Sequence, residues 1–348
     1  MRQSNVWVRA DGLKVLRDHL SDHAVDWGAL AHKFQFDLEV LDATDGVVSL
    51  TAFQEILDLV PTLVGNDALL FDVFSSRNLG EFTVFDYLFI CAPTIRDGCI
   101  AWDRSMPIRT NAIEIKYSEL GGVGYLEWIH SNLYGPWRQN MFARMGWAAG
   151  RFESALGETT APINIEIAAE PPVHVSKFQE RYASRIKFNA SRNVIRIEKE
   201  ILDRKPRRHE DNLYAIVQRS ALQELATVSA SQSPVVEISE KIAEALKTGA
   251  CNLNAVARSY GTSPRSLQRL LEQHGTSFRQ LTDDVRKTSA KRYLLETRLP
   301  MKEIAFLLGF GEISAFSRAS KAWFGAAPKS IRQGHNTIPE DGDPALET

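Results

Sequence analysis

The stretch that decides the fold is residues 253–324, which begins LNAVARSYGTSPRSLQRL at Leu253 and ends MKEIAFLLGFGEISAFSRASKAWF at Phe324. One pattern occurs twice in it: apolar residues at i, i+3, i+4 and i+7, a glycine, and a second amphipathic segment. The glycines are Gly261 and Gly309, 48 residues apart. The apolar spacing predicts a helix with one buried face, and glycine accepts the left-handed backbone of a tight turn. Helix, short turn and helix is the helix-turn-helix layout, and the sequence predicts two of them.

The second segment of each copy keeps its polar side chains on the face opposite its apolar ones. In the first copy, Ser263 suits the N-cap of a helix and Pro264 its first position. Arg, Gln and Ser side chains can read base edges in a major groove, and helix N-termini hold phosphates. The alternative for each residue is a solvated helix face. The predicted base-reading residues are Arg265, Ser266, Gln268, Arg269, Ser314, Ser317 and Arg318, and the predicted phosphate contacts are Ser263 and Lys321.

A third helical segment joins the two copies. Apolar residues recur at helical spacing over residues 278–297, and Pro300 follows the end of the run. About 20 helical residues span roughly 30 Å, which is close to the ~34–36 Å repeat of duplex DNA. This length predicts two reading helices that enter successive major grooves on one side of a duplex.

Residues 234–332 resemble the DNA-binding domain of the AraC/XylS family of transcription regulators. YGTSPRSLQRLLEQHGTSF (260–278) is similar to the first helix-turn-helix of that family, and LPMKEIAFLLGFGEISAFSRASKAWFGAAPKSIR (299–332) is similar to the signature around its second. The chain departs from the family pattern at Gly311, where a capping residue is usual, and at Ser320, where Phe is usual. The resemblance implies a sequence-specific regulator, by family habit an activator, with double-stranded DNA and RNA polymerase as partners.

The distribution of charge separates the same region from the rest of the chain. Residues 251–332 hold 14 Lys and Arg against 6 Asp and Glu, whereas the remaining residues hold 27 against 37. The chain as a whole carries a formal charge of −2. A basic block in an acidic chain is the electrostatic footprint of a domain that binds a polyanion.

Ahead of this region the sequence predicts a mixed α+β domain. Residues 111–117 and 123–129 alternate apolar and polar side chains around a glycine cluster, as an antiparallel hairpin does. Further strands are predicted at 163–168 and 194–198, so the domain should combine helices with a small antiparallel sheet. The predicted helices cover residues 11–20, 51–63, 67–77, 82–104 (with a break at Pro93), 136–153 (opened by Pro136), 174–185 and 211–230.

This domain resembles the arabinose-binding-type N-terminal domain of one branch of AraC-like regulators. The segments FTVFDYLFICAPTIRDGCIAW (82–102) and AEPPVHVSKFQERYASRIKFNASRNVIRIEKEILDRKP (169–206) carry the resemblance. It implies that the domain binds a small-molecule effector and supports a homodimer. It identifies neither the effector nor the residues that bind it.

The Ser-rich segment SASQSP (229–234) marks a domain boundary. The predicted organisation is an effector-binding and dimerisation domain at 1–232, an all-α domain with two helix-turn-helix motifs at 233–332, and a disordered tail at 333–348. The tail is polar and acidic and contains Pro and Gly. The N-terminal residues lack the apolar core of a signal peptide, and no run of ~18 apolar residues occurs, so we expect a cytoplasmic protein without a membrane span.

Motifs for other chemistry are absent from the sequence. It contains no G-x-S-x-G, Walker-type or H-E-x-x-H pattern, so we expect no catalytic residues, no metal and no cofactor. His19 and His23 lie four residues apart, but no third metal ligand is near them in the sequence. The scattered Cys91, Cys99 and Cys251 predict reduced structural thiols, with a redox sensor built on the first two as the alternative.

Two other functions stay open at this point. The N-terminal domain could serve only to pair the protomers of a ligand-independent regulator, or it could be an enzyme fused to a DNA-binding module. A melting temperature that rises with a metabolite would favour effector binding, because a ligand specific for the folded state stabilises it. Four tryptophans could line a ligand pocket or belong to the core: Trp102, Trp128, Trp137 and Trp147.

Overall fold

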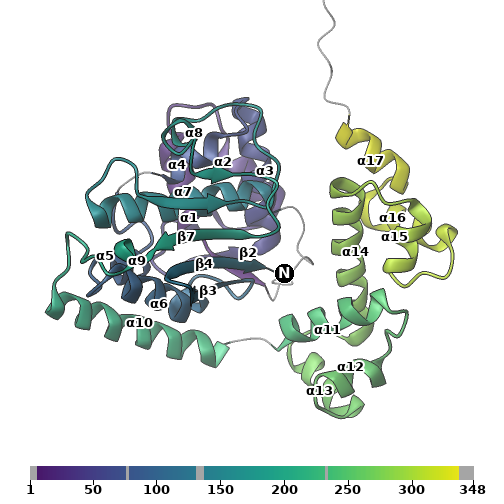
Figure 1. Ribbon diagram of the computed structural model, residues 1–348. Helices are drawn as coiled ribbons and strands as arrows, with labels where there is room; N and C mark the ends of the chain where they lie inside the picture. The colour runs from purple at the N-terminus through teal and green to yellow at the C-terminus, as the bar shows by residue number, and fades with distance from the viewer. Residues whose placement is uncertain (1–5, 76–77, 131–136, 232–233, 337–348) are drawn as a thin grey trace, which may run out of the picture. The chain divides into compact units, whose positions relative to one another are not determined.

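The structure is a computed structural model, and it describes residues 6–75, 78–130, 137–231 and 234–336 (Figure 1). The chain forms two compact units that divide at residues 232–233. The first unit combines helices with two β-sheets, and the second is helical throughout the residues that the structure describes. A mixed α+β region followed by a helical one was predicted, and this part of the fold class is confirmed.

The main sheet of the first unit is larger than the small antiparallel sheet that the sequence predicts. Across the sheet its five strands are β3 (Ile113–Leu120), β4 (Val123–His130), β7 (Asn193–Glu198), β5 (Ile163–Glu166) and β6 (Ile186–Lys187). Neighbouring strands are antiparallel except β5 and β6, which run parallel. The predicted sheet was therefore wrong in size, and its antiparallel direction fails only for the pair β5 and β6. The two-residue strand β6 is too short to show an alternating pattern.

The hairpin of β3 and β4 follows directly from its sequence. Gly121 and Gly122 form its turn with φ of 60° and 82°, and a two-residue turn with positive φ at both positions matches the twist of the flanking strands. Ile113 and Ile115 on β3 and Leu126 on β4 are buried. The apolar face of the predicted alternation therefore lies in the core.

A second, two-stranded sheet has no counterpart in the sequence predictions. Strand β1 (Trp7–Arg9) pairs antiparallel with β2 (Val47–Ser49). The Arg9 N–H donates to the Arg109 carbonyl at 2.9 Å, and the Thr110 hydroxyl donates to the Trp7 carbonyl at 2.6 Å. Three-residue strands offer too few positions for an alternation to be detected, although here they fix the N-terminal segment onto the unit.

The helices of the first unit match most of the long predicted segments. The predicted helix at 82–104 is two helices, α5 (Val84–Ile90) and α6 (Ile95–Ser105), which are separated around Pro93 as expected. Only five residues of the predicted helix at 174–185 are helical, and Pro136 lies outside the described residues. Helix α10 packs on α5 and α6 (Figure 1). The helices are α1 (Asp11–His19), α2 (Trp27–Phe34), α3 (Leu50–Val64), α4 (Leu69–Phe74), α5 (Val84–Ile90), α6 (Ile95–Ser105), α7 (Arg138–Leu156), α8 (Lys177–Arg181), α9 (Lys199–Leu202) and α10 (Asp211–Ser231), with 3-10 turns at Leu38–Leu41 and Met106–Ile108.

Helix α7 packs against α3, α4 and α5 and carries a buried ion pair. The Arg151 Nε–H on α7 donates to Oδ1 of Asp86 on α5 at 2.6 Å, and neither side chain has exposed surface. Asp86 also accepts the Trp147 Nε1–H at 3.0 Å and the backbone N–H of Phe82 at 3.2 Å. These bonds satisfy the buried carboxylate and hold α5 against α7.

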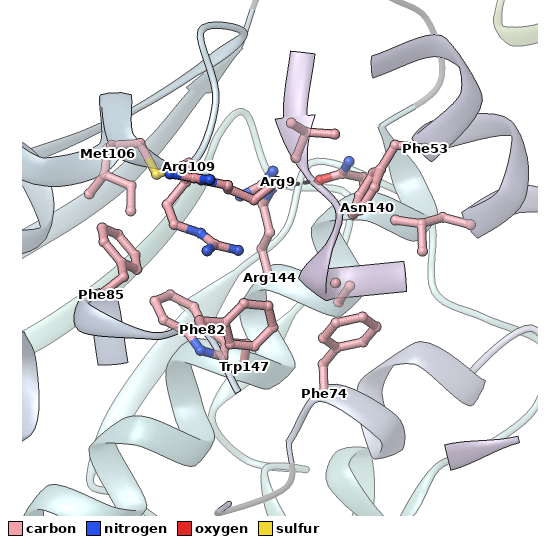
Figure 2. A pocket seen from close by; sticks show the side chains of 15 residues that line it. Arg9, Phe53, Phe74, Phe82, Phe85, Met106, Arg109, Asn140, Arg144 and Trp147 are labelled. Atoms are coloured by element: carbon pink, nitrogen blue, oxygen red, sulfur yellow. Dashed lines mark hydrogen bonds between the residues drawn. The ribbon is translucent and has the colours of Figure 1, made fainter. Parts of the chain in front are cut away.

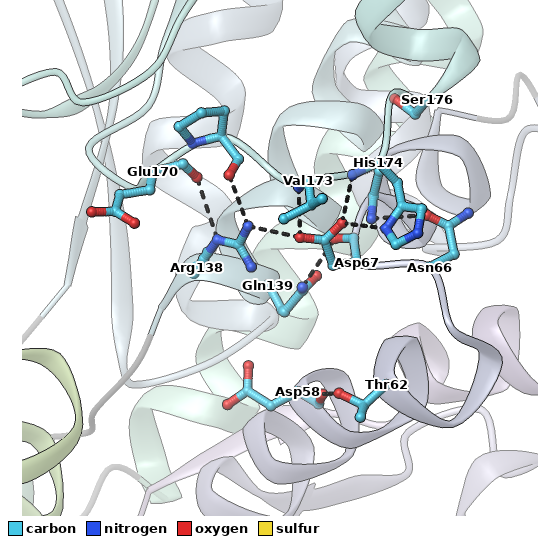
Figure 3. Close-up of polar contacts among 12 residues, drawn as sticks. Asp58, Thr62, Asn66, Asp67, Arg138, Gln139, Glu170, Val173, His174 and Ser176 are labelled. Atoms are coloured by element: carbon cyan, nitrogen blue, oxygen red, sulfur yellow. Dashed lines mark hydrogen bonds and ion pairs between the residues drawn. The ribbon is translucent and has the colours of Figure 1, made fainter. Parts of the chain in front are cut away.

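A second carboxylate, that of Asp67, organises the loop that precedes α8 (Figure 3). It accepts the backbone N–H groups of Val173 at 2.9 Å and His174 at 3.0 Å, and it contacts Nδ1 of His174 at 2.9 Å. It also accepts a guanidinium N–H of Arg138 at 3.0 Å. Burial acts to raise the pKa of Asp67, but these donors outweigh it and hold the pKa below its usual value.

Replacing Asp67 with asparagine is expected to lower the free energy of unfolding by about 1.5–3 kcal/mol at pH 7, the usual range for hydrogen bonds to a charged group. A carboxyl with a lowered folded-state pKa stabilises the fold above its unfolded-state pKa, ~3.9, and loses this contribution as the pH falls. Thermal melts of wild type and D67N should therefore differ clearly at pH 7 and by less at pH 3, because the contribution of the charge starts to fall near the unfolded-state pKa and is lost only at still lower pH. An equal difference at both values would contradict this role for the Asp67 charge.

The second unit is built on one long helix, α14 (Phe278–Glu296; Figure 1). A hydrophobic cluster lies at each end of this helix. The first half of α14 contributes Leu281 and Val285 to the cluster that contains Val256 and Leu267. Its second half contributes residues to the cluster that contains Phe316. The helices of this unit are α11 (Val235–Lys247), α12 (Leu253–Ser259), α13 (Pro264–Gln273), α14 (Phe278–Glu296), α15 (Met301–Leu307), α16 (Ile313–Phe324) and α17 (Pro328–Asn336).

The last helix extends into the segment that was predicted to be a disordered tail. Helix α17 ends at Asn336, so residues 333–336 are helical. The Gly and polar residues there weaken the sequence signal for a helix, but the helix has already begun at Pro328, a favourable first position. The rest of the predicted tail, residues 337–348, lies outside the described residues.

Candidate nucleic-acid interface and ligand pocket

Helices α13 and α16 carry the predicted base-reading residues in the same register. Counted from the first helical residue, Arg265 and Ser314 are second, Gln268 and Ser317 are fifth, and Arg269 and Arg318 are sixth. The fourth residues, Leu267 and Phe316, are both fully buried. The six polar side chains are exposed except that of Ser317, which is half-buried, and Ser266 is exposed as well. Because residues three and four apart share one face of a helix, the two helices present matching polar faces.

The helices that precede α13 and α16 also correspond, because each ends at a glycine turn and buries a residue in its cluster. Helix α12 ends at a turn in which Gly261 has a φ of 76°, and α15 ends at a turn in which Gly309 has a φ of 69°. Val256 on α12 and Ile304 on α15 are fully buried in their respective clusters. The glycines therefore have the left-handed backbone that the sequence pattern predicts.

The start of α13 has the predicted N-cap. The Ser263 hydroxyl oxygen accepts the backbone N–H of Ser266 at 3.1 Å, and the two hydroxyls lie 2.8 Å apart. Pro264 occupies the first helical position. The capping role of Ser263 is confirmed, whereas its contact with a phosphate stays a prediction.

The start of α16 differs from that of α13. Its N-cap is Glu312, which makes no capping hydrogen bond with its side chain, and the Ser314 hydroxyl donates to the Glu312 carboxylate at 3.0 Å. A carboxylate at this end is favourable for the helix dipole but repels a phosphate. The exposed Arg318 and Lys321 place the positive charge of α16 further along the helix.

Two polar contacts secure the second helix pair. Ser320, at the position where a Phe was expected from the resemblance, is fully buried and donates its hydroxyl to the Ala326 carbonyl at 3.0 Å. The serine therefore sits in the core with its hydrogen bond satisfied. Arg286 on α14 donates to the carbonyls of Leu308 at 2.9 Å and Gly309 at 3.3 Å. These bonds attach the turn before α16 to the long helix.

The first unit contains a cavity that is partly open to solvent. It lies among β1, α1, α3, α4, α5, β3 and α7, and its walls are mainly aromatic and aliphatic (Figure 2). Phe53, Phe82 and Trp147 are among the rings, and Arg9, Arg109 and Arg144 bring three guanidinium groups to the same space. A concave apolar site with a few polar groups is the usual form of a small-molecule pocket.

Only a weak sequence signal points to this cavity. Of the four tryptophans that could line a pocket, Trp147 does so, while Trp102 and Trp128 are buried elsewhere in the core. Arg144 interrupts the apolar run MFARMGWAA (141–149). A cation within an otherwise apolar helix segment is the one sequence signal for a site there, and Arg144 was not among the predicted site residues.

Comparison with known families covers both units. A family model described as the arabinose-binding domain of AraC transcription regulators matches residues 25–206, more than half of the chain. The chain belongs to the AraC family of transcription regulators. A helix-turn-helix domain model matches residues 256–334, from within α12 to within α17. This chain is therefore a DNA-binding transcription regulator with an arabinose-binding-type N-terminal domain.

Curated relatives of the regulator are named for the same role. The ornithine utilization regulator of Pseudomonas aeruginosa is 26% identical over 323 residues, which are 92% of this chain and 94% of that protein. VirS of Mycobacterium tuberculosis is 39% identical over 87 residues, 25% of this chain and 26% of VirS. The transcriptional activator RhaS of Salmonella arizonae is 34% identical over 87 residues, 25% of this chain and 31% of RhaS.

Other candidate residues from the sequence have ordinary surroundings. Cys91 and Cys99 are buried, and burial raises the pKa of each thiol, which disfavours the reactive thiolate. Among the described residues, His19 and His23 are not part of any group of three possible metal ligands. In the same residues, no helix is both long and apolar enough to cross a membrane.

Proposed function

We propose that this regulator reads DNA with two helices, α13 and α16, which enter successive major grooves on one side of a duplex. The observation that carries the proposal is their shared register, with matching polar faces on helices that pack near opposite ends of α14. Helix α14 has 19 residues and so spans about 28 Å, close to the ~34–36 Å between successive major grooves. The positive charge of residues 251–332 supplies attraction to phosphates.

The proposed contacts follow from side-chain chemistry. The guanidinium groups of Arg265, Arg269 and Arg318 can each donate two hydrogen bonds to a guanine, and the Gln268 amide can pair with an adenine. Ser266, Ser314 and Ser317 can contact neighbouring base edges, while Ser263 and Lys321 contact phosphates.

We further propose that a small-molecule effector binds in the cavity of the first unit and controls this activity, and that the regulator works in the cytoplasm as a homodimer. The cavity favours this over a ligand-independent regulator. The residues that line it are apolar, arginine or asparagine, with no nucleophile or carboxylate, which favours binding over catalysis. The effector must bind one state of the regulator more tightly than another, and that difference in affinity sets the size of the response. The name of RhaS, a transcriptional activator, supports activation. The family resemblance implies RNA polymerase as the partner.

Hydroxyl-radical footprinting tests the two-helix reading. A preferred duplex is first selected from a random pool with the full chain. We expect two protected patches on one side of that duplex, with centres about 10 base pairs apart. A single patch would contradict the proposed role of α16.

A further inference from the structure

The cavity of the first unit has an unbalanced charge. Three arginines are among its lining residues, and no aspartate or glutamate is among them. Two of the three guanidinium groups have carboxylate partners outside the lining. Arg109 forms an ion pair with Asp11, and Arg9 lies 3.5 Å from the carboxylate of Glu224 and donates to the Ile108 carbonyl.

Arg144 differs from the other two. Its Nε–H donates to the Asn140 side-chain oxygen at 2.6 Å, and no carboxylate of the described part of the chain pairs with it. Burial, with the positive charge of Arg109 adding to it, lowers the pKa of Arg144 to about 9. The side chain therefore remains a cation at neutral pH in surroundings that disfavour its charge. The side chain is half-buried, and a charge held partly away from water without a carboxylate partner is disfavoured. A bound anion would offset this cost.

The rest of the cavity is suited to an apolar body. The rings of Phe53, Phe82 and Trp147 line it, and the Arg109 guanidinium lies 5.0 Å from the centre of the Phe82 ring. Figure 2 shows Arg144 among these aromatic side chains. A ligand with a charged end at Arg144 and an apolar end between the rings would use both features. The planar fork of a guanidinium matches the two oxygens of a carboxylate.

We propose that the effector is a small organic carboxylate with an aromatic or aliphatic body, and that Arg144 binds its carboxylate. The proposal rests on the effector control proposed above and specifies the chemical class of the effector. In the absence of the effector, Arg144 lowers the stability of the pocket, and the bound carboxylate reverses this effect.

Benzoate, neutral benzamide and cationic benzamidine have nearly the same shape and differ in charge. Comparing their binding therefore isolates the effect of charge. Hexanoate and hexanamide form the corresponding aliphatic pair. Each is added to the full chain, and the melting temperature and the apparent Kd are measured. We expect at least one carboxylate to bind tenfold or more tightly than its amide and to raise the melting temperature by about 3–5 °C at ten times its Kd. Benzamidine should have no effect.

Variants at Arg144 test the assigned residue. In Arg144→Met the carboxylate effect should fall to that of the amide, while the melting temperature without probe should equal or exceed that of wild type. Arg144→Lys, which keeps the charge and loses the fork, should retain part of the effect. Arg138→Met is the matched control on the same helix, because Arg138 pairs with Asp67 outside the cavity. It should lower the starting melting temperature and keep the full carboxylate effect.

The proposal is overturned if no carboxylate binds more tightly than its amide, or if R144M keeps the carboxylate effect. A fall of more than about 5 °C in the melting temperature of probe-free R144M, well beyond an ordinary surface change, would also overturn it, since Arg144 would then be a structural cation. The DNA-binding proposal is tested separately in the same samples, by their preference for the selected duplex without any probe. If wild type shows no preference for that duplex, the proposed DNA-binding function is wrong, but the carboxylate result remains valid.

Discussion

Replacing Arg269 with alanine is expected to weaken binding to the selected duplex by about 5- to 150-fold, the equivalent of roughly 1–3 kcal/mol for one good base contact. Binding to unrelated DNA should fall much less, because it depends on the phosphate charge alone. Arg269 is exposed at the sixth position of α13 and makes none of the contacts that hold the helix in its cluster. The measurement is a pair of fluorescence-anisotropy titrations at one fixed salt concentration.

The matched control for this variant is Arg258→Ala. Arg258 is exposed on the neighbouring helix α12 and carries the same charge outside the reading helix. We expect its removal to lower both affinities by the same small factor. If Arg269→Ala behaves in the same way, Arg269 contacts only the DNA backbone, and the base-reading role of the sixth position is wrong.

Replacing Asp86 with asparagine is expected to cost about 3–5 kcal/mol, the range found when one partner of a buried ion pair is removed. Arg151 would then be left with a buried charge that has lost its closest carboxylate. For a unit of this size the melting temperature should fall by about 6–20 °C. Differential scanning calorimetry of the full chain measures this as a lower midpoint temperature of the first unfolding transition.

The same variant should also disturb the pocket, because Trp147 lines the cavity and donates to Asp86. Asp45→Asn is the control: Asp45 is exposed, and the same change there should alter stability by no more than about 0.5 kcal/mol. Equal melting temperatures for D86N and D45N would show that the buried pair contributes little to the fold.

Long periodic segments were predictable from the sequence, and short or non-local ones were not. The turn glycines Gly261 and Gly309 and the long helix between the two pairs follow from a local pattern with many repeats. Strands β1, β2 and β6 have two or three residues each and take their conformation from pairing partners that are distant in the chain. Local propensity cannot report such pairing.

The same distinction holds for the two candidate sites. Predicting the register of Arg269 and Arg318 requires only the first residue of each helix. Pro264 and the turn glycines indicate where the two helices start. The role proposed for Arg144 depends on Asp11 and Glu224 lying beside the other two guanidinium groups after folding. Which cation is left without a carboxylate partner is decided by tertiary packing, and no spacing in the sequence encodes it.

The most direct test of the DNA-reading account is one competition experiment with the full chain at about 150 mM salt. A duplex selected from a random pool competes against a shuffled duplex of the same composition, so both carry the same phosphate charge. We expect the selected sequence to bind about 1,000-fold more tightly or better, the lower end of the range for specific regulators. Equal affinities would mean that α13 and α16 attract phosphates without reading bases, and the central claim would be wrong.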